Sequence, residues 1–144
     1  MILGVGVDVC DVRRLRRAME RRGFRERVFD EDEIRDCEAR ARQAPHYAAR
    51  FAAKEACFKA LGTGWGGGVA WKDVIVRRDG GGPPRLDLRD GAARAAAGLG
   101  VARAHLSLSH EGDYAVAMVV LEGRARAADR PARRRTAARR ATRR

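Results

Sequence analysis

The sequence predicts an α+β fold in which a mainly antiparallel sheet packs against a long helix. Three observations support this class. The chain opens on a Val-rich apolar segment, an alanine-rich helical segment lies near its middle, and two alternating segments separated by a short turn follow later. The regular alternation of strands and helices that builds a parallel sheet is missing, so antiparallel pairing is favoured.

The first half is predicted to hold one strand and three helices. Residues 2–9 alternate too weakly for an edge strand and are interpreted as a buried one. A helix over 12–22 follows, with an apolar face and an outer side that carries arginines at four-residue steps. Residues 30–42 begin with acids and finish with arginines, which suits a helix dipole. Pro45 then suits the first turn of a long helix over 46–61.

The second half is predicted to be richer in strands. The predicted elements are a strand over 69–77, a DGGGPP turn over 79–84, a strand over 85–89, a small-residue helix over 90–99, and a hairpin of 104–110 and 114–122. Strands joined by such short turns pair antiparallel, which agrees with the predicted fold class.

The charge divides the chain into a domain over 1–123 and a tail over 124–144. The tail has ten Arg and one Asp, a net +9 of the total +12, so the domain carries only +3. We expect this Arg/Ala-rich tail to be disordered, because it has almost no large apolar residue. It leaves open one alternative function from another class, a basic module that binds nucleic acid without sequence preference.

The composition predicts a cytoplasmic protein. No apolar run approaches the roughly 20 residues that a membrane-spanning helix needs. The apolar N-terminus lacks the basic segment of a signal peptide and is interpreted as a strand. Cys10, Cys37 and Cys57 are odd in number and have no metal-ligand spacing, so we interpret them as free thiols in a reducing compartment.

Charges interrupt the alanine-rich helix in the segment RFAAKEACFKALGTG, residues 50–64. The pair Glu55 and Lys59 is compatible with an ordinary exposed ion pair one helical turn apart. The tightly packed neighbours and the following Gly62-Thr63-Gly64 favour a site instead, because glycine backbone approaches an anion closely. The segment lacks the ending of a Walker loop, so it does not predict a nucleoside triphosphate site.

Two further segments carry polar groups in apolar surroundings. Asp8 lies in an apolar strand and either caps the next helix together with Asp11 or binds a partner. With Glu55 it offers two hard oxygen ligands, a set that suits Mg²⁺ together with phosphate oxygens and water. In AHLSLSH, His105 shares a face with Ser107 and Ser109, and is either structural or close to a diphosphate. No acid at a suitable spacing completes a serine-nucleophile triad.

Three motifs resemble a known family in both order and spacing. GVGVDVCDV, RFAAKEACFKALGTG and HLSLSHEGDYAVAMVVLE are similar to those of the holo-acyl-carrier-protein synthases, the small 4′-phosphopantetheinyl transferases, over about residues 1–122. The resemblance implies their fold, a trimer with active sites between subunits, and transfer of phosphopantetheine from coenzyme A to a serine of an apo-acyl carrier protein. Adenosine 3′,5′-bisphosphate is the other product, and fatty acid biosynthesis is the implied pathway. Carriers of polyketide or nonribosomal peptide synthases are alternative partners.

The resemblance also implies roles for individual residues. Asp8 and Glu55 match the ligands of Mg²⁺, and Lys59 matches the lysine on the coenzyme phosphates. The residues implied to contact coenzyme A are Arg50, Lys59, Gly62, Thr63 and His105, and those implied to act in catalysis are Asp8, Glu55, Lys59 and His105. The arginines implied to dock the acidic carrier are Arg13, Arg14, Arg17 and Arg21. The enlarged GGGPP turn and the basic tail depart from the family pattern.

Overall fold

The computed structural model describes residues 1–124, so the predicted disorder of the tail falls almost entirely outside the described residues. The elements are β1 (Ile2–Asp11), α1 (Val12–Met19), α2 (Phe24–Val28), α3 (Glu31–Glu38), α4 (Gln43–Leu61), a 3₁₀ turn η1 (Trp71–Asp73), β2 (Val74–Arg77), β3 (Arg85–Leu88), α5 (Asp90–Leu99), β4 (Val101–Glu111) and β5 (Tyr114–Gly123).

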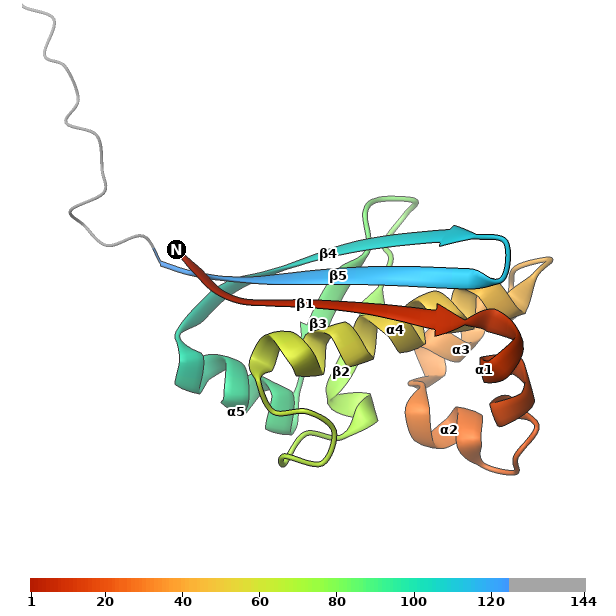
Figure 1. Ribbon diagram of the computed structural model, residues 1–144, viewed down its shortest axis with the longest axis horizontal. Helices are drawn as coiled ribbons and strands as arrows, with labels where there is room; N and C mark the ends of the chain where they lie inside the picture. Colours follow the sequence, from red (N-terminus) through yellow and green to blue (C-terminus); the bar gives the residue numbers. More distant parts are fainter. Residues whose placement is uncertain (125–144) are drawn as a thin grey trace, which may run out of the picture.

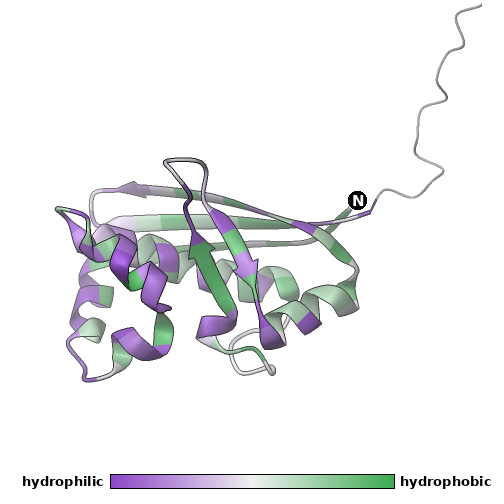
Figure 2. Cartoon of the chain, turned by 180° about the vertical axis from the view of Figure 1, so that it is seen from behind, coloured by the Kyte–Doolittle hydropathy of each residue, from purple (hydrophilic) through white to green (hydrophobic). Residues whose placement is uncertain are grey.

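The strands form two antiparallel sheets, which confirms the predicted α+β class. One sheet has the order β1-β5-β4, and the other consists of β2 and β3. The long helix α4 lies along one face of the three-stranded sheet, as predicted, with α1 to α3 near one end and α5 near the other (Figure 1). The short strand β2 is strongly apolar (Figure 2), and its Val74, Ile75 and Val76 are buried.

Several elements differ from the sequence-based expectations. Helix α1 ends at Met19 rather than at residue 22, α3 ends at Glu38 rather than at 42, and β4 begins at Val101 rather than at 104. The short helix α2 was not predicted, because its five residues carry three charges and show no apolar period. Strand β2 begins later than residue 69, since residues 71–73 form η1. Helix α4 begins at Gln43, three residues before the predicted start, and Pro45 lies in its first turn as expected.

The prediction that residues 2–9 form a buried strand was wrong for the single chain, where β1 is an edge strand with one open face. Val5, Val7 and Val9 are more than half exposed, at 57%, 53% and 59%. The alternation was hidden because the helix-facing positions Gly4 and Gly6 are also counted as apolar. Strand β1 therefore has an exposed face of valines and a helix-facing side with glycines.

A buried ion pair joins α3 to α4 inside the core. The Lys54 ammonium donates to Glu33 Oε2 at 2.8 Å and to the carbonyl oxygen of Trp71 at 3.1 Å, and both charged side chains are fully buried. The Glu33 carboxylate also accepts from the backbone N–H groups of Asp30 and Val76 at 2.9 Å each. The charges are thus compensated by partners from four segments, the condition under which burial of an ion pair is tolerated.

Within residues 1–124, none of the helices combines the length and the hydropathy that a bilayer crossing requires.

Candidate active site

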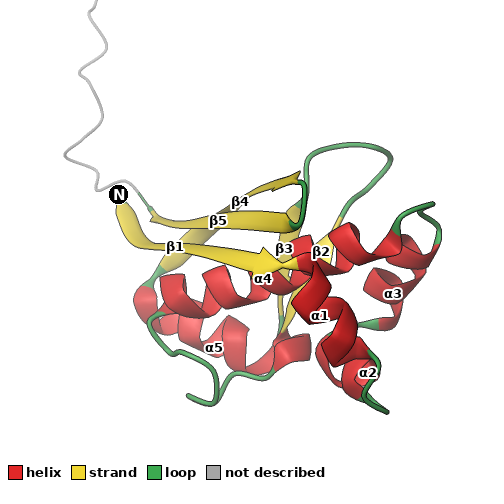
Figure 3. Ribbon diagram, turned by 45° about the vertical axis from the view of Figure 1, so that its right-hand side comes forward, coloured by secondary structure: helices red, strands yellow, loops and turns green. Residues whose placement is uncertain are grey.

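The absence of side chains at two positions of β1 lets the strand lie directly on α4. A Cβ atom at Gly6 would lie 1.8 Å from the carbonyl oxygen of Ala56, and one at Gly4 would lie 2.1 Å from that of Ala60. Glycine is therefore required at this crossing. Asp8 follows on the same face of β1, nearer the middle of α4, and Figure 3 shows the two elements packed against each other.

Asp8 forms an ion pair with Lys59 across this contact. The Lys59 ammonium donates to Asp8 Oδ1 and to the carbonyl oxygen of Val7, both at 2.9 Å. The Asp8 side chain is 19% exposed and that of Lys59 is 53% exposed. Asp11 alone caps α1, accepting from the N–H groups of Arg13 and Arg14. The alternative that Asp8 shares this capping role does not hold.

Glu55 lies one helical turn before Lys59 and close to Asp8. Burial raises the pKa of the Glu55 carboxyl, and the neighbouring negative charge of Asp8 raises this pKa further. The charge of Asp8 thus disfavours the ionised form of Glu55, so the arrangement attracts a cation. Lys59 supplies part of that positive charge in the described structure.

The donor set fits Mg²⁺. Among residues 1–124 there is no group of three or more His, Cys, Asp or Glu side chains that is able to enclose a metal ion. Asp8 and Glu55 offer two carboxylates beside an open cavity, and Mg²⁺ commonly takes one or two carboxylates and completes its shell with phosphate oxygens and water. Cys10 lines the same cavity, but burial, and next the charge of Asp8, raise its pKa to about 11, so the thiol stays protonated.

The cavity around these groups has a volume of about 800 Å³ and a basic wall. Arg14 and Arg17 of α1 and Arg21 of the turn after it contribute this wall, which places three of the four predicted docking arginines at the cavity. The fourth, Arg13, lies outside the lining and pairs with Asp113 at 3.4 Å. The lining also includes Phe24, Phe51 and Leu15, so apolar surface adjoins the carboxylates.

The predicted anion contacts of Gly62 and Thr63 are not offered by their backbone N–H groups. Gly62 has φ = 72° and ends α4, and its N–H donates to the carbonyl oxygen of Lys59 at 3.1 Å. The N–H of Thr63 donates to the carbonyl oxygen of Phe58 at 3.3 Å. Both groups therefore cap the helix. The Thr63 hydroxyl oxygen is buried without a hydrogen-bond partner among the described residues.

Arg50 lies apart from the carboxylate cavity, in a second and smaller one. It is only 6% exposed, approaches Asp36 at 3.5 Å, and its Nε atom is buried with no hydrogen-bond partner in residues 1–124. This second cavity, of about 180 Å³, is lined by His46, Arg50, Arg78 and His110, among others. The cavity therefore gathers two guanidinium and two imidazole groups, an arrangement suited to a phosphate.

Of the two histidines in AHLSLSH, it is His110 and not His105 that lines this basic cavity. The ring of His110 lies edge-on to that of His46, with 6.1 Å between the ring centroids. His105 lies on the exposed face of β4, lines neither cavity, and its Nε2 is 2.8 Å from Glu122 Oε2. Alternation along AHLSLSH places His105 and His110 on opposite faces of the strand. This alternation was the sequence signal that only one of them would face the cavity.

The matched family agrees with this geometry. A family model described as the 4′-phosphopantetheinyl transferase superfamily matches residues 4–119, which include Asp8, Glu55, Lys59 and all three histidines. The chain belongs to this superfamily. The basic tail lies beyond the matched residues.

The curated relatives and solved structures described below are all named holo-[acyl-carrier-protein] synthase. The holo-[acyl-carrier-protein] synthase of Koribacter versatilis is 49% identical over 124 residues, covering 85% of this chain and 99% of the relative. That of Desulforudis audaxviator is 54% identical over 127 residues, covering 85% and 95%. Among solved structures, the Neisseria meningitidis enzyme has a TM-score of 0.77 at 31% identity, covering 85% and 99%. The Helicobacter pylori enzyme in complex with coenzyme A has a TM-score of 0.72 at 27% identity, covering 82% and 99%.

Proposed function

We propose that the protein is a Mg²⁺-dependent holo-[acyl-carrier-protein] synthase. It transfers 4′-phosphopantetheine from coenzyme A to a serine of apo-acyl carrier protein in fatty acid biosynthesis and releases adenosine 3′,5′-bisphosphate. The observation that carries this proposal is the meeting of Asp8, Glu55 and Lys59 at one cavity, in a chain that belongs to the transferase superfamily.

The side chains of the cavity have distinct parts in this reaction. Asp8 and Glu55 hold a Mg²⁺ ion, which when bound supplies positive charge to the two linked phosphates. Lys59 exchanges its hydrogen bond to Asp8 for one to the phosphate on the leaving side, where negative charge grows as the bond breaks. The apolar wall at Phe24 and Phe51 excludes water, which limits hydrolysis of the coenzyme in competition with the carrier serine.

The second cavity is proposed to bind the 3′-phosphate of coenzyme A. Arg50 is held by the fold and keeps an N–H group that has no partner among residues 1–124, and Arg78 and His110 face the same space. The contact that the resemblance placed at His105 is therefore assigned to His110. Burial, together with nearby arginines, lowers the pKa of His46, so this ring is a neutral member of the cavity at neutral pH.

The active form is proposed to be a homotrimer with sites between neighbouring subunits. Asp8 lies on the edge strand β1 and His110 on the opposite edge strand β4, with β5 between them. Bringing the two cavities onto one coenzyme therefore favours a contribution from a second subunit. Val5, Val7, Val9 and Met118 form an open apolar face on β1 and β5, which supports burial against another copy. Val7→Asp should dissociate the assembly and abolish transfer, as measured by light scattering and activity on the same sample.

The carrier is proposed to dock on Arg14, Arg17 and Arg21, which border the cavity that receives its serine. Acidic carriers of fatty acid synthesis are the preferred partners, and carriers of polyketide or nonribosomal peptide synthases are the alternative. A cytoplasmic location is proposed from this role and from the three cysteines, which are all buried and free in the described chain. A nucleic-acid-binding role would rest on the tail, so deleting residues 124–144 should leave the transfer intact.

Mass spectrometry of the carrier tests the proposed function directly. The protein is incubated with apo-acyl carrier protein, coenzyme A and Mg²⁺, and the carrier should gain one phosphopantetheine group on its serine. Addition of EDTA, or replacement of the protein by Asp8→Asn, should prevent this gain. An unmodified carrier after prolonged incubation with the wild-type protein would refute the function, and transfer that persists in EDTA would refute the metal.

A further inference from the structure

Helix α3 contributes the carboxylates of three ion pairs that join it to β2 and α4. The pairs, with their N···O distances, are Arg77–Asp32 at 2.7 Å, Lys54–Glu33 at 2.8 Å and Arg50–Asp36 at 3.5 Å. The first two distances are typical of charge-assisted hydrogen bonds, and the third is longer than a well-formed bond. The contact between Asp36 and Arg50 is therefore the loosest of the three.

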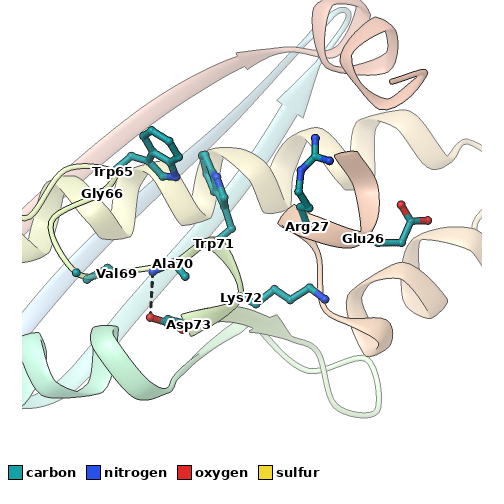
Figure 4. A pocket seen from close by; sticks show the side chains of 10 residues that line it. Glu26, Arg27, Trp65, Gly66, Val69, Ala70, Trp71, Lys72 and Asp73 are labelled. Atoms are coloured by element: carbon teal, nitrogen blue, oxygen red, sulfur yellow. Dashed lines mark hydrogen bonds between the residues drawn. The ribbon is translucent and has the colours of Figure 1, made fainter. Parts of the chain in front are cut away.

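The pair of Lys54 and Glu33 holds α3 in place without help from Asp36. Both of its side chains are fully buried, and Lys54 also donates to the carbonyl oxygen of Trp71 at 3.1 Å. Figure 4 shows the indole of Trp71 lying against α4, so the pair ties α3 to α4 and to η1. Asp36 lies one helical turn after Glu33 and is thus brought beside Arg50 by the fold. A substitution at Asp36 is expected to leave this anchor intact.

The side chain of Arg50 adjoins both the basic cavity and Asp36. Asp36 is not among the lining residues of this cavity, so its carboxylate contacts the guanidinium from outside the cavity. Arg50 Nη1 donates to the carbonyl oxygen of His46 at 3.4 Å, and Nη2 donates to Asp36 Oδ2 at 3.5 Å. Nε has no partner among residues 1–124. Nε and Nη2 form an edge with which arginine binds an oxyanion through two parallel hydrogen bonds, so Asp36 occupies half of this edge.

The exposures of the two side chains make this contact exchangeable. The side chain of Arg50 is 7% exposed, so a missing counter-ion would leave a buried charge uncompensated, which is unfavourable. The side chain of Asp36 is 42% exposed, so water hydrates its carboxylate when the hydrogen bond breaks. Among the described residues, Asp36 is the one carboxylate that pairs with a cation of this cavity. It therefore serves as the counter-ion of Arg50 until a phosphate binds.

We propose that Asp36 competes with the 3′-phosphate of coenzyme A for Arg50, and that this competition speeds the release of adenosine 3′,5′-bisphosphate. This inference rests on the proposed function, in which the basic cavity binds the 3′-phosphate of the substrate and therefore also that of the product. Asp36 touches neither molecule. It acts through Arg50 and sets affinity, so it is not a catalytic residue.

Two effects of Asp36 oppose phosphate binding at Arg50. The phosphate must displace Asp36 from Nη2 to form both hydrogen bonds of the edge, and the displaced carboxylate then repels the phosphate at short range. Both effects act equally on coenzyme A and on adenosine 3′,5′-bisphosphate, because both carry the 3′-phosphate. An unopposed guanidinium would hold the product more firmly and slow its release, a step that limits turnover in many enzymes.

Kinetics with two donors test the role of Asp36. Asp36→Asn keeps the size of the side chain and removes its charge, and coenzyme A is compared with 3′-dephospho-coenzyme A. The variant should lower the KM for coenzyme A about fivefold, the effect of one partly exposed charge in contact. It should leave the KM for 3′-dephospho-coenzyme A unchanged, because this donor has no phosphate for Arg50. The inhibition constant of adenosine 3′,5′-bisphosphate should also fall about fivefold.

Asp32→Asn is the matched control on the same helix. Asp32 is 43% exposed and pairs with Arg77, and neither residue lines the basic cavity. The KM values of this control for both donors should equal those of the wild type. A higher KM for coenzyme A in Asp36→Asn would overturn the inference, since Asp36 would then orient Arg50 for the phosphate. So would an equal change for both donors, or a fall of the same size in the control.

Product binding provides a second test that does not require turnover. The unfolding temperature of each protein is measured with and without adenosine 3′,5′-bisphosphate, which raises it by binding the folded state. The rise should be larger in Asp36→Asn than in the wild type, and Asp32→Asn should match the wild type. Because each rise is measured within one protein, a lower starting stability of Asp36→Asn does not disturb the comparison. A smaller rise in Asp36→Asn would overturn the inference.

The rate of product release is measured by stopped-flow displacement of adenosine 3′,5′-bisphosphate. Release from Asp36→Asn should be about fivefold slower than from the wild type, because changes in affinity appear mainly in the dissociation rate. Equal or faster release would show that Asp36 does not promote this step.

The levels of the proposal fail in different ways. If the wild type gives no transfer from coenzyme A, the proposed function is wrong. If the wild type has the same KM for coenzyme A and 3′-dephospho-coenzyme A, the basic cavity does not bind the 3′-phosphate. If the wild type distinguishes the two donors and Asp36→Asn distinguishes them to the same degree, only the role of Asp36 is wrong.

Discussion

Lys59 Nζ lies 2.9 Å from Asp8 Oδ1, so the cation proposed for the coenzyme phosphates is hydrogen-bonded to the carboxylate proposed for the metal. A divalent ion that binds Asp8 Oδ1 must compete with this ammonium group. In the proposed mechanism the coenzyme resolves the competition, because its phosphates would attract Lys59 and bring oxygen ligands for the ion. Metal and coenzyme are therefore expected to bind with positive coupling.

Removing the ammonium group should separate these effects. Lys59→Met is expected to tighten Mn²⁺ binding in the absence of coenzyme, because Asp8 and Glu55 lose a competing cation, and to weaken coenzyme A binding. Titration calorimetry with each ligand alone measures both changes. Lys72→Met, which removes a lysine outside the lining of this cavity, serves as the matched control. Weaker Mn²⁺ binding in Lys59→Met would show that the ion does not compete for Asp8.

The raised pKa of Glu55 has a consequence for stability. Burial and the charge of Asp8 raise this pKa above its ordinary value of 4.5, so the folded protein holds the proton more tightly than the unfolded chain does. This contribution to stability is fully present below pH 4.5 and is lost as the pH rises through the folded-state pKa. Glu55→Gln should therefore increase the free energy of unfolding at neutral pH without metal, while abolishing metal binding.

Urea denaturation at several pH values checks the Glu55 prediction. The difference between Glu55→Gln and wild type should shrink as the pH falls towards 4.5 and should also shrink when saturating Mg²⁺ and coenzyme A stabilise the wild type. A variant that is less stable than wild type at neutral pH without ligands would contradict the electrostatic account.

The buried pair of Lys54 and Glu33 predicts a large loss of stability from a small change. Lys54→Met keeps most of the side-chain volume and leaves the Glu33 carboxylate buried without its cation, which should cost about 3–5 kcal/mol. The double variant Lys54→Met with Glu33→Leu should recover part of the loss. Chemical denaturation measures both. If the single variant loses less than about 0.5 kcal/mol, the range of a surface substitution, the pair is not closed in solution.

Local sequence patterns predicted the two carboxylates of the site. The position of the basic cavity at Arg50 was not predictable from such patterns, because it depends on the three-dimensional fold. Asp8 and Glu55 were identifiable because each is a charged residue in an apolar element, and their proximity follows once Gly6 allows β1 to lie on α4. Neither the family motif nor the strand period indicated that Arg50 and His110 line the same cavity, since this depends on how α4 packs against β4. The edge position of β1 was also hidden, because pairing order is a property of the whole sheet.

The arginines of α1 and of the turn after it provide a prediction with a control on α1 itself. Arg17→Glu combined with Arg21→Glu should raise the KM for the acyl carrier protein by about tenfold and leave the KM for coenzyme A unchanged, because opposite charges steer the encounter of the two proteins. Arg16→Glu changes the charge of the same helix at an exposed position outside the cavity lining and should have a much smaller effect.

The dependence of the carrier KM on ionic strength distinguishes a loss of electrostatic steering from misfolding of the variant. In the wild type the carrier KM should rise with ionic strength, since salt screens exposed charges beyond a Debye length of about 10 Å at 0.1 M. In the double variant this dependence should be weaker or reversed. If Arg16→Glu raises the carrier KM as much as the double variant does, net charge rather than the cavity wall governs docking. A parallel rise of the KM for coenzyme A would instead show that the reversal disturbs the reaction cavity itself.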